Sequence, residues 1–488
     1  MAAAARTVRE RLAAEIGTIR KDAPGRVALV YPSPYDVAMS SLGYQTLYRA
    51  INARTGFVAE RAFLPDDGDD ARSGLRTYES GQAVGDFPIV AVSVAFELEL
   101  AGLVSVLDRA GIPALAQDRK PGDPFVLLGG PLTFSNPLPL APFADAVLLG
   151  EADETLHIAL DVLTSARSRE HARRALADAI DSCWVPTLHA DVLPPLGRCD
   201  DALLPAFSQV ITPHTELSSM FLVEPARGCS RGCTYCVMRR STNGGMRIVP
   251  MERVLALVPA HAKKVGLVGA AVSDHPKIAQ LVETLADRGL SVSLSSLRPD
   301  RLDDRLAAAL RRGGYRTLTT AADGASQRVR DAILRKTREA HLERAATLAR
   351  THGFDRLKLY TMLGVPGEHD DDVDELVALG RRLSAIVPVA LTVSPFVAKR
   401  NTPLDGSPFA GIDVVERRLA KLRRGLAGRV DLRSASARWA WVEHALAQGG
   451  RELGLAALEA ARSGGSFAAW RRAIESRVHV PRRLAVVA

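Results

Sequence analysis

The sequence predicts an α/β protein in which an N-terminal, doubly wound parallel sheet is followed by a second series of alternating strands and helices. Three observations predict this class. Short apolar runs alternate with helical patterns in both halves of the chain, the hydrophobic fraction of 47% suits globular cores, and 488 residues are enough for two or three domains. A Pro-rich stretch at 181–215 separates the two series, and we expect a connector there.

The first series covers 1–180. It begins with a short buried strand at 26–32, which a proline ends, and a helix near 41–53. Further strands are expected at 88–94, 125–130 and 146–150, with helices at 98–110 and 152–165. Ligands of parallel sheets of this kind bind beyond the carboxyl ends of the strands. Four segments are expected to meet there: Tyr31–Tyr35, Ser93–Phe96, Gly129–Pro131 and Gly150–Glu151.

The second series covers 216–408 and contains about six strand–helix units. Its strands are expected at 221–223, 264–269, 291–295, 317–320, 357–363 and 389–394. Its helices are expected at 251–260, 275–288, 303–312, 326–335, 339–352 and 370–386. This alternation fits an open (β/α)6 barrel. Residues 409–488 have mainly helical patterns, including helices at 414–426 and 438–461.

A cysteine triplet follows the first strand of the second series. Cys229, Cys233 and Cys236 have the spacing C-x3-C-x2-C. Three thiolates so close together can hold three irons of a 4Fe–4S cluster and leave the fourth iron open to a small molecule. Positive charge for such an anionic site is supplied nearby by Arg227, Arg231, Arg239 and Arg240.

The alternatives for the triplet are a zinc site and buried structural cysteines. Zinc usually takes four protein ligands in paired spacing. The nearest candidate for a fourth ligand is His214, which lies fifteen residues before Cys229. The ligand count therefore favours an iron–sulfur cluster.

The triplet, with Tyr235 inside it, resembles the cluster loop of the radical S-adenosylmethionine (SAM) enzymes, C-x3-C-x-aromatic-C. The resemblance implies that the three cysteines hold a 4Fe–4S cluster whose open iron chelates SAM. It also implies reductive cleavage of SAM to methionine and a 5′-deoxyadenosyl radical, and the same open barrel that the alternation predicts.

Three further segments are similar to the SAM-binding segments of that family. Gly364–Glu368 ends the fifth strand of the barrel and looks like the glycine–proline turn that contacts adenine, while Ser295–Arg298 and Asp323 end the third and fourth strands. Ordinary strand-to-helix turns and helix caps are the alternative interpretation. The resemblance implies a SAM site made of Tyr235, Ser295, Arg298, Asp323, Gly364, Pro366 and Gly367.

The N-terminal half resembles the cobalamin-binding-type domain that precedes many radical SAM barrels, the class B type. The similar segments are 27–48, 90–97, 127–131 and 148–153, with 266–276 and 394–404 in the barrel region. The resemblance implies a cobalamin site at the carboxyl edge of the first sheet. Its residues would be Tyr31, Ser93, Gly129, Gly130 and Gly150.

One motif of the cobalamin domain departs from the family pattern. The usual loop, D-x-H-x-x-G, supplies a histidine as the lower cobalt ligand, whereas Ala38–Gly43 has alanine for the aspartate and Ser40 for the histidine. Two interpretations remain open: cobalamin binds without an imidazole beneath the cobalt, or the domain has lost the cofactor.

The leading functional hypothesis is a radical SAM methyltransferase that moves a methyl group from cobalamin to an unactivated carbon. The first alternative is a cobalamin-independent cyclisation, rearrangement or oxidation with a vestigial N-terminal domain, and the second is a non-catalytic cluster-binding protein. Methylthiolation of RNA is disfavoured because its enzymes carry extra N-terminal cysteines, and here none precedes Cys183. No catalytic side chain and no particular substrate can be identified from the sequence.

Composition limits the partners. The formal net charge is +8 and the basic excess lies in the C-terminal half, where it suits a polyanion such as nucleic acid or simply forms an arginine-rich surface. Aromatic residues make up only 5%, which gives little base-stacking surface and favours a small-molecule or modified-metabolite substrate. Five cysteines are too few for a disulfide framework, so a cytoplasmic protein is expected. The resemblance to radical SAM enzymes implies a reductant such as a flavodoxin or ferredoxin. No signal peptide or membrane-length apolar run is expected.

Overall fold

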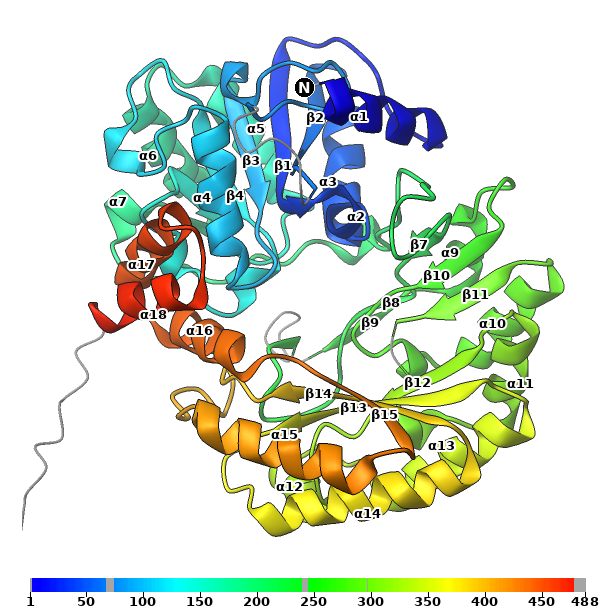
Figure 1. The fold of residues 1–488 in the computed structure, drawn as a ribbon. Helices are drawn as coiled ribbons and strands as arrows, with labels where there is room; N and C mark the ends of the chain where they lie inside the picture. The colour runs from blue at the N-terminus through cyan, green and yellow to red at the C-terminus, as the bar shows by residue number, and fades with distance from the viewer. Residues whose placement is uncertain (1, 67–73, 239–244, 296, 478–488) are drawn as a thin grey trace, which may run out of the picture.

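The computed structural model describes residues 2–66, 74–238, 245–295 and 297–477. Its strands form one six-stranded sheet in the N-terminal half, two parallel sheets in the C-terminal half and a two-stranded ribbon (Figure 1). The predicted class, a doubly wound sheet followed by an open barrel and C-terminal helices, is confirmed. No helix within the described residues is long and apolar enough to span a membrane.

The N-terminal sheet has the order β2-β1-β3-β4-β5-β6, with a single antiparallel strand, β6. Its strands are β1 (Gly25–Pro34), β2 (Phe57–Leu64), β3 (Ile89–Ser93), β4 (Phe125–Gly129), β5 (Ala146–Leu148) and β6 (Cys183–Trp184). One face is covered by α3 (Leu42–Ala53), α5 (Thr155–Ser165) and α6 (Arg169–Ala179), and the other by α4 (Glu99–Arg109). The strand order reverses between β1 and β3, so the ligand crevice of such a sheet lies beyond their carboxyl ends.

Strand β2 and helix α6 are absent from the sequence prediction. In β2 the charged residues Glu60 and Arg61 interrupt the apolar run, yet both are buried. Arg61 forms ion pairs of 2.7 Å with Glu15 and 2.6 Å with Glu79, while Glu60 accepts a hydrogen bond from Thr77. Because these partners are distant in sequence, a local pattern does not reveal that the strand is buried.

The C-terminal half forms two parallel sheets, β11-β10-β7 and β12-β13-β14-β15, which a bridge between Leu297 and Thr320 joins. The strands are β7 (Phe221–Val223), β10 (Lys264–Leu267), β11 (Ser291–Leu294), β12 (Thr317–Ala321), β13 (Arg356–Leu363), β14 (Val389–Pro395) and β15 (Val430–Ser434). The helices outside them are α9 (Met251–Leu257), α10 (Ile278–Asp287), α11 (Asp304–Arg312), α12 (Gln327–Ala332), α13 (Glu339–Thr351), α14 (Asp370–Ile386) and α15 (Ile412–Leu426). The six predicted strands are all present, whereas β15 lies in a region expected to be mainly helical.

The cysteine loop is held between two short strands, β8 (Ala226–Gly228) and β9 (Met246–Ile248), which pair in an antiparallel ribbon. The ribbon fixes both ends of the loop at one place. The loop therefore projects from the ribbon toward the carboxyl ends of the barrel strands.

The last three helices, α16 (Ala437–Gln448), α17 (Arg451–Arg462) and α18 (Phe467–Glu475), return to the N-terminal sheet, where α17 packs on α4 (Figure 1). The single helix predicted at 438–461 is two helices, broken at Gly449–Gly450. Leu453, Ala457 and Trp470 belong to the same buried core as α4. The C-terminal helices thus complete the hydrophobic core of the N-terminal domain.

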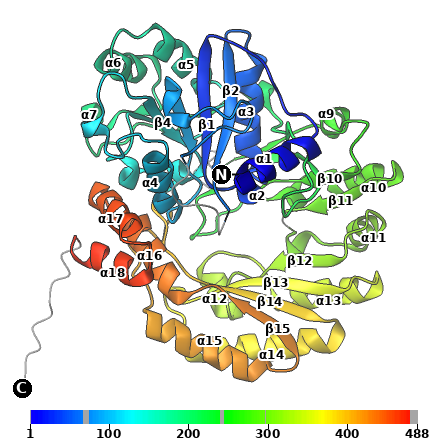
Figure 2. The same cartoon turned by 45° about the horizontal axis from the view of Figure 1, so that its top comes forward.

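The carboxyl ends of the N-terminal sheet and of the barrel face each other (Figure 2). The loop after β14 provides the contacts: Lys399 Nζ lies 2.6 Å from Glu97 Oε2, beyond β3, and Asn401 donates a 2.8 Å hydrogen bond to the carbonyl oxygen of Ser135, beyond β4. A ligand at either edge is therefore close to the other domain.

Candidate active site

The three cysteines come together in one cavity of about 240 Å³ at the carboxyl ends of β11, β12 and β13. The cavity brings the predicted triplet together with four of the predicted SAM-binding residues. Its polar lining consists of Cys229, Arg231, Cys233, Tyr235, Cys236, Ser295, Arg298, Thr319, Thr320, Asp323, Arg335 and Tyr360. Arg239 and Arg240, from which positive charge was also expected, lie outside the described residues.

Two arginines carry positive charge to the cysteines. Arg335 forms a 2.6 Å ion pair with Asp323, and Asp323 also accepts a 2.8 Å hydrogen bond from the hydroxyl of Tyr235. Burial raises the pKa of the Cys236 thiol, so a bound metal or nearby cation is needed to keep it as the thiolate that ligates iron. The guanidinium groups of Arg335 and Arg231 interact with Cys233 and Cys229, respectively, and fit an anionic cluster.

The third barrel strand leads into Ser295 and Arg298, and both residues line the cavity. The Ser295 hydroxyl donates to the carbonyl oxygen of Gly269 at 3.0 Å and accepts from its N–H at 3.1 Å. Arg298 is buried and pairs with Asp300 at 3.2 Å, an aspartate that Arg231 of the cysteine loop also reaches at 3.3 Å. The shared aspartate therefore holds the loop against the end of this strand.

Asp323 has a backbone φ of +63°, in the left-handed region, and this turn directs it to the cavity. Sequence reasoning missed Arg335, Thr319 and Tyr360. Arg335 follows α12 in a stretch without a motif, so only the folded chain brings it to Asp323. The alternation of β13 could have revealed Tyr360, because it shares a face with Lys358 and Met362.

The glycine–proline turn lies beside the cavity, but Gly364, Pro366 and Gly367 are not among the residues that line it. Gly364 has a φ of +82°, and a Cβ atom there would lie 2.9 Å from the Cβ of Ala410. Val365 packs in a small apolar cluster that Tyr235 of the cysteine loop also contacts. The turn therefore contacts the cysteine loop through this apolar cluster, which includes the side chain of Val365 and is contacted by Tyr235.

Replacing Gly364 by valine is expected to weaken SAM binding roughly tenfold while leaving the iron content unchanged, because the clash with Ala410 shifts the turn. Gly353→Val is the matched control: this glycine also has a positive φ, +69°, but no atom lies within 4 Å of its added Cβ. Equilibrium binding of SAM to the two variants separates the clash from backbone strain. If the two variants bind SAM with equal affinity, the turn at Gly364 has only a structural role.

Glu368, the last residue of this turn, is buried beside Arg418, with 2.8 Å between Oε1 and the guanidinium. Its other oxygen, Oε2, is buried without a hydrogen-bond partner, and burial raises the pKa of Glu368 to about 7. The Glu368 carboxyl therefore holds its proton more tightly in the folded chain than in the unfolded chain, where the pKa of glutamate is about 4.3.

The free energy of unfolding is therefore expected to fall as the pH rises from about 4.3 through 7, by about 4 kcal/mol at most. Glu368→Gln should lack this part of the dependence. Urea denaturation of both proteins at pH 5 and pH 8 measures the difference. An identical pH dependence in the two proteins would contradict the assignment.

The residues of the predicted cobalamin site gather at the carboxyl edge of the first sheet, but they are tightly packed. Tyr31 is buried, and burial raises the pKa of its hydroxyl. A Cβ at Gly130 would lie 2.6 Å from the carbonyl oxygen of Val94, and one at Gly150 would lie 2.5 Å from that of Gly197 in the connector. Both glycines, with φ of +103° and +85°, thus allow close contact of backbone with backbone.

Ser40, which stands where the family has histidine, donates its hydroxyl to the carbonyl oxygen of Asp36 at 2.7 Å. A serine hydroxyl engaged in its own helical turn is a poor donor to a metal. The Ser40 hydroxyl is therefore not positioned to replace the histidine imidazole as a cobalt ligand.

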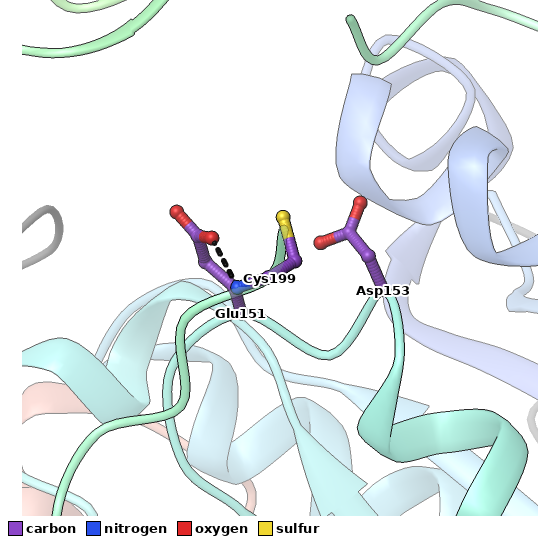
Figure 3. Close-up of side chains that lie close together, drawn as sticks. All are labelled: Glu151, Asp153 and Cys199. Atoms are coloured by element: carbon purple, nitrogen blue, oxygen red, sulfur yellow. Dashed lines mark hydrogen bonds between the residues drawn. The ribbon is translucent and has the colours of Figure 1, made fainter. Parts of the chain in front are cut away.

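A second group of polar side chains consists of Glu151, Asp153 and Cys199 (Figure 3). The side-chain ligand atoms of Glu151, Asp153 and Cys199 lie within 4.8 Å of one another, and the N–H of Cys199 donates to Glu151 at 2.9 Å. Arg227 pairs with Asp153 at 3.2 Å, and Arg247 pairs with Glu151.

Burial raises the pKa of Cys199 to about 12, so this thiol keeps its proton. The guanidinium groups of Arg227 and Arg247 neutralise the two carboxylates. Because Arg227 lies in β8 and Arg247 in β9, these pairs fasten both sides of the cysteine-loop ribbon to the N-terminal domain and the connector.

Two family models match the chain. The model for the N-terminal region of radical SAM proteins matches residues 43–186, and that of the radical SAM superfamily matches residues 223–380. The uncharacterized protein MJ0966 of Methanocaldococcus jannaschii is 26% identical over 395 residues, 78% of this chain and 80% of its own length. The uncharacterized methyltransferase PH0819 of Pyrococcus horikoshii is 22% identical over 284 residues, 53% of this chain and 58% of its own.

Among solved structures, the cobalamin-dependent SAM radical enzyme OxsB with aqua-cobalamin bound matches with a TM-score of 0.54 and 12% identity, over 83% of this chain. This chain spans 58% of the length of OxsB, and at that identity the likeness concerns the fold. The chain is therefore a radical SAM enzyme of the radical SAM superfamily, and it has the fold of the cobalamin-dependent class.

Proposed function

We propose that this enzyme transfers a methyl group from cobalamin to an unactivated carbon of its substrate. The observation that supports this most is the apposition of the two carboxyl edges, with Lys399 from the barrel bonded to Glu97 at the edge of the N-terminal sheet. A cofactor bound at the first edge would face a substrate in the barrel. The names of PH0819, a methyltransferase, and of OxsB, a cobalamin-dependent enzyme, agree with this proposal.

The cysteine cavity is the proposed site of the 4Fe–4S cluster and SAM. Cys229, Cys233 and Cys236 would hold the cluster, which when bound with SAM supplies the electron that generates a 5′-deoxyadenosyl radical. The hydroxyl of Tyr235 and the carboxylate of Asp323 would orient SAM beside it, and Arg298 would face the SAM carboxylate. A flavodoxin or ferredoxin is the proposed reductant.

The crevice between β1 and β3 is the proposed position of cobalamin, which when bound supplies the methyl group. Two apolar side chains are exposed at this edge: Val37, 46% exposed, and Phe96, 43% exposed. Exposed apolar side chains beside a sheet edge suit the face of a corrin ring. Since Gly130 and Gly150 are already covered by backbone, we expect the ring nearer to β1 and β3 than to β5.

Cobalamin bound here is expected to lack the nitrogen splitting that a lower imidazole ligand gives in the electron paramagnetic resonance spectrum of Co(II). Anaerobic purification with quantitation of iron, sulfide and cobalamin provides the sample and tests the proposal directly. Nitrogen splitting from a protein histidine would refute the expected coordination. A full iron–sulfur cluster without bound cobalamin would exclude the methyl-donor mechanism but would still be consistent with a radical SAM enzyme.

The second candidate function is a cobalamin-independent radical cyclisation, rearrangement or oxidation. The observation that favours it is the packing of Gly130 and Gly150 against backbone, together with the engaged hydroxyl of Ser40. In that case the N-terminal domain would act only as a cover for the barrel. The same cobalamin quantitation decides between the two functions.

A further inference from the structure

The inner face of the barrel sheet β12-β13-β14-β15 is polar and open. Residues paired between parallel strands point to the same side of a sheet. Lys358 is paired with Thr319, and Tyr360 with Thr392, which in turn is paired with Arg433. Because Thr319 and Tyr360 line the cysteine cavity, this is the side that faces the interior of the barrel.

The other side of the same strands confirms the assignment of faces. Its residues alternate with the polar ones and pack in the large core beneath helices α11, α13, α14 and α15. They are Leu318, Leu357, Leu359, Leu363, Leu391, Val393, Val430 and Leu432. Each strand therefore has one apolar face toward the helices and one polar face toward the interior.

The interior face carries more positive than negative charge. Its cations are Arg356, Lys358 and Arg433, whereas Asp431 is the acidic residue that the register places among them. Asp431 lies 3.4 Å from the guanidinium of Arg356 and 3.7 Å from that of Arg433. Asp431 is therefore the ion-pair partner of both arginines.

Lys358 has no ion pair with any described residue; its Nζ lies 4.9 Å from the centre of the Tyr360 ring. A half-buried lysine on the interior face of the sheet, beside two residues that line the cysteine cavity and without a counter-ion among the described residues, is available to an anionic ligand. Lys358 lies two residues before Tyr360, about 7 Å along the strand, and so close to the cysteine cavity.

Two threonines lie beside these cations in the register, Thr319 opposite Lys358 and Thr392 opposite Arg433. Thr319 lines both the cysteine cavity and a second hollow of about 380 Å³ at the opposite end of the barrel, to which Lys264 and Ser293 also contribute. Hollows of this size suit a metabolite-sized ligand rather than a polynucleotide.

We propose that the interior face of β12–β15 binds a small anionic substrate through a carboxylate or phosphate group, with Lys358 and Arg433 as the recognising cations and Thr319 and Thr392 as hydroxyl partners. This inference rests on the proposed function, since the bound molecule would be the one whose carbon is attacked. Lys358 recognises the anion by charge, and Tyr360 separates that group from the cysteines.

The test is calorimetric titration of the anaerobically reconstituted full-length enzyme with inorganic pyrophosphate and, separately, with citrate. At least one anion is expected to bind with a stoichiometry of one per chain. The double variant Lys358→Gln/Arg433→Gln should bind it at least about tenfold more weakly, as loss of charge-assisted hydrogen bonds predicts. Whether pyrophosphate or citrate binds distinguishes a phosphate from a carboxylate substrate.

The matched control is Lys277→Gln/Arg312→Gln, which removes the same charge from outward-facing positions, where Lys277 pairs with Glu252 and Arg312 with Asp287. It should bind the anion as the wild type does. Lys358→Arg should retain most of the affinity, and Lys358→Gln alone serves if the double variant does not fold. Equal affinity of the double variant and the wild type, or saturable binding of an oligonucleotide but of neither small anion, would overturn the inference. The proposed function fails separately, if the wild-type enzyme contains no cobalamin.

Discussion

Replacing Cys229, Cys233 and Cys236 together by alanine is expected to remove the brown chromophore and reduce SAM cleavage below detection. The three thiols line one cavity, and the proposed cluster has no other cysteine near it in the sequence. Without thiolates the irons have no protein ligand, so no electron reaches SAM. Iron and sulfide quantitation, with deoxyadenosine release under reducing anaerobic conditions, measures both effects.

The fold is expected to survive this change because the cysteines belong to none of the large cores; of the three, only Cys233 is buried. Cys183→Ala and Cys199→Ala are the controls: both residues are buried and neither lines the cysteine cavity, so both variants should keep a full cluster. A triple variant that retains its iron would refute the assignment of the cluster ligands.

Replacing Lys399 by methionine is expected to lower the free energy of unfolding by about 3–5 kcal/mol at neutral pH. Lys399 Nζ lies 2.6 Å from Glu97 and 2.7 Å from Glu443 of α16, and the side chain of Glu97 is only 2% exposed. Removing the cation leaves Glu97 buried beside a second carboxylate. Chemical denaturation followed by circular dichroism measures the loss.

The pH dependence of this loss identifies its cause. Burial already raises the pKa of Glu97 against the opposing effect of Lys399, and the variant should raise it further. An acid whose folded-state pKa is raised loses stability as the pH rises through that pKa, so the deficit of Lys399→Met should be larger at pH 8 than at pH 5. Lys421→Met, which breaks the exposed pair with Asp374, should cost less than about 1 kcal/mol at either pH. A deficit independent of pH would contradict the electrostatic account.

Local sequence patterns predicted the elements whose apolar side chains are contiguous, such as β1 and β3, or alternate regularly, such as β13. They failed for β2, because Glu60 and Arg61 are buried by partners distant in sequence, and for β15, whose interior face carries Asp431 and Arg433. The cysteine triplet can be recognised from the sequence because its three thiols are close together in the chain.

The residues that surround the triplet cannot be predicted from local sequence patterns. Arg335 reaches Asp323 only because a loop after α12 returns to the cavity, and its position depends on the whole fold. Gly364 was expected to line the SAM side of the barrel; its neighbour Val365 meets the cluster loop, while the space beside Gly364 is taken by Ala410. A motif indicates which strand end a turn occupies, but not which of its atoms face the cavity.

The return of α17 to α4 has a consequence for how the protein is made. Leu103 and Leu107 of α4 are covered by a helix that leaves the ribosome more than three hundred residues later, a delay of roughly 20–70 s at ordinary rates of synthesis. During that time the nascent N-terminal domain exposes an apolar strip that its own chain cannot yet cover. Translation that stops after the barrel would release a product with this strip open, a natural target for chaperones and proteases. The N-terminal core is therefore complete only after residues 451–475 have been synthesised.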